Sequence, residues 1–360
     1  MAELSIKEMR DVISIDKELE EIVNKQKTKI KVFGVGGGGN NSLTRMREVG
    51  IKGAEMIAIN TDAQDLLYTN ADDKILIGRE LTKGNGAGSN PKVGEEAAHE
   101  SEHEIKEKIV GSDMVFITCG LGGGTGTGAA PVIAEISNKL GILTIGVVTL
   151  PFTIEGNKRY ENAMYGLEGM EEYTDTLIVI PNDKLLELAP ELPIHTAFKI
   201  ADEILTNAVK GVTELITKPG LVNLDFADIK ATMCGGGVAL IGVGESDSQQ
   251  RAAEAVEKAL ENPLLDIEVQ GATGALVNIS GGTDLSLQEA KQVIETVSQK
   301  LSPDAKLIWG AQISEDMEKT LKVMLIVTGV SSPNILGPGE SRRDNDTKQI
   351  SKELGIEFVD

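Results

Sequence analysis

The stretch that decides the fold is Gly122-Gly123-Gly124-Thr125-Gly126-Thr127-Gly128. It follows an apolar run that ends at Thr118, and a helical pattern over residues 129–140 comes directly after it, with Pro131 in the predicted first turn. Residues this small let the backbone approach a phosphate group and aim its N–H groups at it from the N-terminus of a helix. A flexible linker is the alternative, but a linker rarely joins a buried strand directly to a helix. The pattern therefore predicts a phosphate-binding loop.

A second glycine-rich stretch, Gly34-Val35-Gly36-Gly37-Gly38-Gly39-Asn40-Asn41, also separates a predicted strand from a predicted helix. Alone, its glycines match the G-x-G-x-x-G pattern of dinucleotide-binding proteins, and Asp62 at the end of the next strand could bind a ribose. A dinucleotide pyrophosphate needs one such turn, whereas two loops at one pocket suit a longer polyphosphate. No G-x-x-x-x-G-K-[ST] motif occurs, so the chain is not a P-loop enzyme.

Short β-branched runs alternate with helical patterns on both sides of these loops. Such alternation predicts right-handed crossovers and an α/β fold with a doubly wound parallel sheet, which binds ligands at the carboxyl ends of its strands. The strands predicted before the central helix span residues 29–35, 55–59, 74–77, 113–118, 142–149 and 176–180. Those predicted after it span residues 237–243, 274–280, 306–309 and 321–328.

The pattern divides the chain into five parts. A long central helix over about residues 196–216 would be ~30 Å long and separates the domain with the glycine loops from a smaller α/β domain without them. The predicted parts are an N-terminal extension with an amphipathic helix (1–28), the nucleotide-binding domain (29–195), the central helix (196–218), the C-terminal domain (219–330) and a flexible linker with a tail (331–360).

The composition of the 360 residues limits the partners. Asp and Glu total 56 against 35 Lys and Arg, so the formal charge of −21 disfavours direct binding to nucleic acid or anionic lipid. Two cysteines make no disulfide framework and fit a reducing cytoplasm. No apolar run reaches the ~18 residues of a membrane span, and charged residues between Glu3 and Asp11 interrupt any signal peptide. We therefore expect a soluble, cytoplasmic protein.

The motifs together resemble the tubulin and FtsZ families, and FtsZ more closely than tubulin. The acidic N-terminal extension and short tail are more similar to archaeal members. The resemblance implies a cytoplasmic GTPase with a GTP-binding domain, a central helix and a smaller C-terminal domain. It also implies head-to-tail filaments at the mid-cell division site, and Mg²⁺ held mainly through the phosphates of GTP or GDP rather than by a metal site of the protein. Besides the glycine loops, the matching segments lie at residues 60–64, 84–88, 151–159, 181–185 and 223–228.

The resemblance also assigns the nucleotide-binding residues. Asp202 on the central helix would pair with guanine, since a carboxylate can accept from guanine N1–H and the 2-amino group together. Asn41 would add a polar contact to the base, while Phe198 either stacks on the base or belongs to the core. Glu155 and Arg159 would contact ribose and phosphate, although spaced four apart they could equally form an ordinary helical ion pair. The residues predicted to surround the phosphates are Gly37, Gly38, Gly39, Asn40, Gly124, Thr125 and Gly126.

An acidic segment after the central helix holds the predicted catalytic residues, Asn223, Asp225 and Asp228. Two carboxylates in an acidic chain are ordinarily a solvated turn. The resemblance instead makes this segment the synergy loop, which completes the pocket of the next subunit and acts in trans.

Apolar residues return at the end of the chain, where Ile356, Phe358 and Val359 follow the predicted linker. They predict a short motif for an adaptor that tethers filaments to the membrane. Three alternatives stay open: a nicotinamide-dependent oxidoreductase, a filament that fixes cell shape, and a regulatory nucleotide-binding protein that never polymerises. The oxidoreductase lacks a catalytic setting for any of the three histidines.

Overall fold

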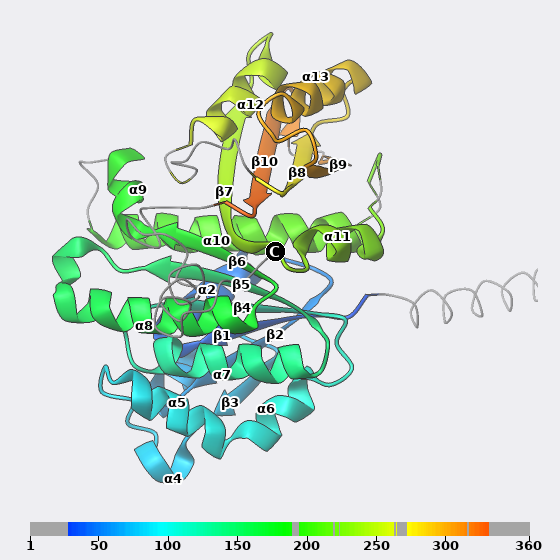
Figure 1. Ribbon diagram of the computed structural model, residues 1–360. Helices are drawn as coiled ribbons and strands as arrows, with labels where there is room; N and C mark the ends of the chain where they lie inside the picture. Colours follow the sequence, from blue (N-terminus) through cyan, green and yellow to red (C-terminus); the bar gives the residue numbers. More distant parts are fainter. Residues whose placement is uncertain are drawn as a thin grey trace, which may run out of the picture.

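The structure is a computed structural model, which describes residues 28–188, 194–218, 220–222, 224–262, 264, 272–314 and 317–330. Residues 1–27 of the predicted extension, Asn223, and the predicted linker and tail lie outside the described residues. The described chain forms a sheet with helices packed on both faces (Figure 1).

Ten strands in the described part of the chain form one sheet. They are β1 (Ile30–Val35), β2 (Ala54–Asn60), β3 (Asp73–Leu76), β4 (Met114–Gly120), β5 (Leu143–Leu150), β6 (Thr176–Pro181), β7 (Gly237–Ser246), β8 (Gly274–Gly281), β9 (Lys306–Ile313) and β10 (Leu321–Thr328). Their order is β3-β2-β1-β4-β5-β6-β7-β10-β8-β9. Only β10 is antiparallel to its neighbours, β7 and β8. The first six strands have the 3-2-1-4-5-6 order of a doubly wound fold, which confirms the predicted fold class.

The two predicted domains share this sheet. Strand β6 pairs in parallel with β7, with Thr176 opposite Gly237 and Ile178 opposite Ala239. The short pairing joins the parallel half to the half that contains β10, so the sheet runs through the whole described molecule.

Helices cover both faces of the sheet. Helices α5 to α8, with α12 and α13, pack on one face, whereas α2, α10 and α11 pack on the other. The helices are α2 (Gly36–Val49), α3 (Ala63–Tyr68), α4 (Arg79–Thr82), α5 (Pro91–Glu100), α6 (Glu102–Ile109), α7 (Thr125–Lys139), the 3₁₀ turn η1 (Thr153–Glu155), α8 (Asn157–Tyr173), α9 (Asn182–Leu188), α10 (Ile194–Thr217), α11 (Phe226–Met233), α12 (Arg251–Leu260) and α13 (Leu287–Ser298).

Strand β1 shows why the predicted strands are apolar nearly throughout. Val32 belongs to the core on one face and Phe33 to the core on the other, and both are fully buried. Strands covered on both faces need apolar side chains at every position, as is typical of parallel sheets.

Helix α10 is the long central helix, and its 24 residues make it ~36 Å long. Its buried residues, among them Leu205 and Val212, share one core with Ile145 of the first half of the sheet and Ile326 of the second. One end of α10 lies beside α9 and the other beside α11 (Figure 1). The helix can therefore connect two distant sites of the molecule.

Helix α7 begins earlier than predicted. Its first residue is Thr125 instead of 129, and Gly128 N donates to Gly124 O at 3.0 Å to close the first turn. Pro131 is consequently inside the helix, so its predicted position in the first turn is wrong. The second half of the Gly-Thr stretch is a helix N-terminus, because Gly and Thr can adopt helical dihedrals where the fold requires them.

Candidate nucleotide-binding site

The two glycine loops leave neighbouring strands. β1 and β4 pair in parallel with Val35 opposite Cys119, and the strand order reverses between them. Helix α2 starts after β1 and α7 starts after β4, so both helix N-termini lie at the carboxyl edge of the sheet. Ligands of doubly wound sheets bind at this switch point, and helix N-termini offer free N–H groups to anions.

The loops are packed against each other, which explains several of the glycines. Gly36 has φ +69°, and a Cβ on it would lie 2.8 Å from the backbone nitrogen of Gly126. A Cβ on Gly39 would lie 2.4 Å from the carbonyl oxygen of Thr118. The hydroxyls of Thr61, which follows β2, and Thr125, the first residue of α7, are 2.6 Å apart and connect these two segments. Small residues at these positions let the two loops approach.

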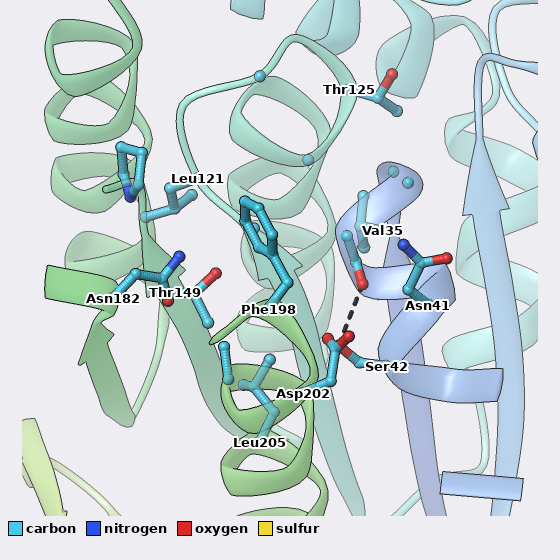
Figure 2. Close-up of a pocket in the computed structure, with 18 of the residues that line it drawn as sticks. Val35, Asn41, Ser42, Leu121, Thr125, Thr149, Asn182, Phe198, Asp202 and Leu205 are labelled. Carbon is cyan, nitrogen blue, oxygen red and sulfur yellow. Dashed lines mark hydrogen bonds between the residues drawn. The ribbon is translucent and has the colours of Figure 1, made fainter. Parts of the chain in front are cut away.

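A cavity of about 350 Å³ lies over the loops and reaches the first turns of α10 (Figure 2). Its size suits a small-molecule ligand. Of the predicted site residues, it is lined by Gly37, Gly38, Asn41, Gly124, Thr125, Gly126, Glu155, Arg159, Phe198 and Asp202.

Gly39 and Asn40 are predicted phosphate neighbours that are buried in the first turns of α2 instead of lining the cavity. Asn40 Nδ2 donates to Asp65 Oδ2 at 3.2 Å, and Asn60 Nδ2 donates to the same oxygen at 2.6 Å. The bonds to Asp65 fix the position of the first loop. Contact of Gly39 and Asn40 with a nucleotide stays a prediction.

Asp202 lies on the cavity wall in the third turn of α10. Its Oδ1 accepts a hydrogen bond from Ser42 Oγ of α2 at 2.8 Å (Figure 2). Burial raises the pKa of the Asp202 carboxyl, although the Ser42 bond and the nearby Arg45 act in the opposite direction. A partly buried carboxylate on the wall of a cavity is suited to accepting hydrogen bonds from the N–H groups of a base.

Phe198 is 41% exposed and lines the cavity, so it is not a core residue. Its ring meets the buried ring of Phe152 edge to face, with the centroids 5.1 Å apart. That contact holds Phe198 from the side and leaves ring surface available to a base.

Glu155 and Arg159 form the predicted ion pair. Arg159 Nη1 donates to Glu155 Oε2 at 2.5 Å, while Glu155 Oε1 accepts from Phe152 N at 2.9 Å. Both also line the cavity, so the ion pair and a ligand role are compatible. Arg159 is the one Lys or Arg among the described lining residues, so backbone N–H groups must supply most of the attraction for phosphate.

The sequence reasoning missed several lining residues, among them the polar Ser42, Thr149 and Asn182. Asn182 is 4% exposed, and its Oδ1 has no partner within the described chain. It follows β6 directly, so its place at the carboxyl end of a strand was a usable signal. A buried unpaired acceptor at the wall is suited to a ligand hydroxyl or N–H.

Asp225 and Asp228 are exposed and lie at the start of α11, beyond the opposite end of α10. The helix between Asp202 and Thr217 alone spans ~22 Å, so the acids are remote from the cavity of their own chain. The structure does not bring the predicted catalytic residues to the predicted nucleotide site, and Asn223 is outside the described residues.

Two glycine loops at the switch point of a doubly wound sheet, with an acid across the cavity from them, define a nucleotide-binding protein of the tubulin-like class. Residues 29–190 match the family model described as "Tubulin/FtsZ family, GTPase domain", and residues 237–331 match "FtsZ family, C-terminal domain". The chain belongs to the Tubulin/FtsZ family. It is a GTPase, as the matched domain implies.

Curated relatives are similar along nearly the whole chain. "Cell division protein FtsZ 1" of Thermococcus kodakarensis is 62% identical, with 91% of this chain and 88% of the relative aligned. The solved "FtsZ dimer, empty" of M. jannaschii is 59% identical, with a TM-score of 0.84 over 91% of this chain and 93% of that one. The GDP-bound CetZ1 monomer of Haloferax volcanii covers 91% of this chain and 100% of its own, with a TM-score of 0.75 and 23% identity, and shares the fold.

The oxidoreductase alternative loses its ribose-binding acid. Asp62 caps α3, accepting from the backbone nitrogens of Gln64 and Asp65, and it does not line the cavity.

Among the described residues, no helix is long and apolar enough to cross a membrane. The same part of the chain has no cluster of three or more His, Cys, Asp or Glu side chains that could hold a metal ion.

Replacing Asp202 by asparagine should stabilise the free protein at neutral pH and weaken GTP binding. A carboxyl whose folded-state pKa is raised stabilises the fold fully at pH values below its ordinary pKa. This stabilisation is lost as the pH rises through the raised pKa. The charge is therefore unfavourable at pH 7, and Asp202→Asn should raise Tm. GTP affinity should fall by ~1–3 kcal/mol, because a guanine donor stays unpaired.

Thermal melts and GTP titrations from pH 4 to pH 8 measure both effects. As the pH is lowered, the native protein should lose GTP affinity when the Asp202 carboxyl becomes protonated. Because the pKa of Asp202 is raised, this loss should begin at a higher pH than for a carboxyl with an ordinary pKa. Equal GTP affinity in the native protein and the variant would remove Asp202 from the site.

Proposed function

We propose that this chain forms head-to-tail filaments that work in cell division, and that GTP is hydrolysed at the contact between successive subunits. The observation that carries the proposal is the separation of the nucleotide cavity from Asp225 and Asp228 along α10. In a head-to-tail polymer, the acidic end of one subunit meets the nucleotide end of the next. The names of the relatives, "Cell division protein FtsZ 1" and "FtsZ dimer, empty", support it.

Exposed apolar side chains at both ends are consistent with such contacts. On α3, close to the first glycine loop, Leu67 and Tyr68 are 70% and 78% exposed. Near the acidic segment, Leu221 is 60% exposed. A head-to-tail interface pairs two different surfaces, and burying these side chains would contribute to its stability.

The residues divide the work of hydrolysis. The two loops bind the phosphates through backbone N–H groups, Asp202 and Phe198 hold the base, and Glu155 with Arg159 contacts ribose and phosphate. Asp225 and Asp228 of the neighbouring subunit, with Asn223, would orient and polarise the attacking water.

Mg²⁺ fits this site as a companion of the nucleotide. The described residues contain no cluster that would hold the ion alone, so phosphate oxygens and water would be its main ligands, as is common for Mg²⁺. When bound, the ion would offset phosphate charge.

Sedimentation of the purified protein with GTP, GDP or ATP tests the proposal. We expect filaments to pellet with GTP and not with GDP or ATP. The specific GTPase activity should rise with protein concentration as contacts between subunits form. A protein that binds GTP but never pellets would be the regulatory alternative. Localisation in dividing cells separates a division filament, expected at mid-cell in the cytoplasm, from a filament that fixes cell shape.

The tail, which lies outside the described residues, is proposed to bind a membrane-tethering adaptor through Ile356, Phe358 and Val359. Truncation after Gly337 should leave GTPase activity and sedimentation within about twofold of the native values, because the loops and the acidic segment are intact. Localisation at the division site, followed by microscopy, should be lost. Normal division rings from the truncated protein would show that the tail is not the tether.

A further inference from the structure

Ser42 makes a hydrogen bond that the assigned roles leave unexplained. It is fully buried on α2, and its Oγ lies 2.8 Å from Asp202 Oδ1 on α10 and 3.1 Å from the carbonyl oxygen of Gly38. A serine in a helix commonly donates to the carbonyl four residues before it, which here is Gly38. Ser42 therefore has a local acceptor and a distant one for its single hydrogen.

The distant acceptor is the stronger one. A hydroxyl has one hydrogen, an ionised carboxylate can only accept, and hydrogen bonds to charged acceptors are about twice as strong as neutral ones. The short distance to Asp202 agrees with a hydroxyl that donates across the gap between the helices. The bond connects the helix that begins with the first glycine loop to the helix that carries Asp202.

Asp202 needs such a bond to read a base. The terminal torsion of an aspartate has a broad energy profile, so the backbone alone does not fix the plane of its carboxylate. Accepting from guanine N1–H and the 2-amino group together requires both oxygens in the plane of the base. A donor that holds Oδ1 restricts that plane before the nucleotide arrives, and Oδ1 keeps a further lone pair for guanine.

We propose that Ser42 is a positioning residue for guanine specificity, which acts by fixing the carboxylate of Asp202. The inference rests on the proposed pairing of Asp202 with guanine. Of the charged side chains near Asp202, Arg45 also favours its ionised form, while Glu155 and Arg159 at the cavity wall are paired with each other.

The test compares affinities for GTP and for inosine triphosphate, which lacks the 2-amino group, in the full-length protein. Ser42→Ala removes the donor, and Ser42→Cys keeps a side chain of similar size with a much weaker donor. Ser42→Thr keeps the hydroxyl, which can still rotate in a helix. We expect the GTP preference to fall about fivefold or more in the alanine and cysteine variants and to persist in the threonine variant.

A second readout is the pH dependence of GTP binding. Since the Ser42 bond favours the charged form of Asp202, Ser42→Ala should move the loss of GTP affinity to higher pH. Packing alone would make the cysteine variant behave like serine, or lower GTP and inosine triphosphate affinities equally, and either result would overturn the proposal. Asp202→Asn, measured in parallel, separates the two assignments: an unchanged base preference there refutes the guanine role of Asp202 itself.

Discussion

Replacement of Asp225 by alanine is expected to lower GTP turnover at least 100-fold and to leave GTP affinity within about twofold. Two decades of rate correspond to ~3 kcal/mol of transition-state stabilisation, a size that the loss of a water-positioning group can account for. Affinity should persist because Asp225 is exposed at the far end of α10 and does not line the cavity of its own chain. Single-turnover kinetics and equilibrium GTP binding, both above the assembly concentration, measure the two quantities.

Complementation shows whether the loss acts in trans. A variant with Gly123 replaced by valine should fold, because a Cβ at this position meets no neighbouring atom within 4 Å, but it should bind GTP poorly and be nearly inactive alone. It still carries an intact acidic segment, which it can present to the GTP-loaded pocket of an Asp225→Ala subunit. The mixture should recover activity that neither variant has.

Dilution gives an independent control for the same idea. Below the assembly concentration, turnover per subunit of the native protein should fall toward the level of the Asp225→Ala variant. Constant turnover per subunit at high dilution would mean that one chain contains the complete site, contrary to the separation along α10.

The glycine loops were predictable because a phosphate-binding loop needs several small residues in succession, which are visible in the sequence. Gly36 and Gly39 are required by close packing, so the same run of small residues indicates both the approach of the loops and a surface open to phosphate. Their meeting at one cavity followed from the alternation of strands and helices, since adjacent parallel strands end at the same edge.

Ser42 has no such signal in the sequence. A serine on a helix is common in solvated positions, and only the fold shows that it is buried at the cavity wall, whereas the place of Asn182 directly after β6 was a signal that the prediction did not use. The pairing of β6 with β7 was hidden for a similar reason: 55 residues lie between the end of β6 at Pro181 and the start of β7 at Gly237, and periodicity says nothing about contacts between such distant segments. Asp202 was found through the family resemblance, because one acid on a long helix is ordinarily a solvated residue.

The second glycine loop allows a matched pair of substitutions that separates binding from folding. Gly123 lines the cavity, has no protein atom within 4 Å of an added Cβ and is not among the positive-φ glycines. An added Cβ on Gly126 would lie 2.9 Å from the carbonyl oxygen of Gly120 and 3.2 Å from that of Val35. The same methyl group therefore meets open space at one position and backbone at the other.

Gly123→Ala should leave Tm nearly unchanged and weaken GTP binding about 10- to 100-fold, or ~1.4–2.8 kcal/mol, because the methyl group occupies space that the phosphates need. Gly126→Ala should lower the free energy of unfolding by ~1–3 kcal/mol, since backbone around the loop must shift. Melting curves of the nucleotide-free proteins and GTP titrations distinguish the two effects. If Gly123→Ala bound GTP as tightly as the native protein, the phosphates would not approach the loop at Gly123. The space beside Gly123 would then not be the phosphate site.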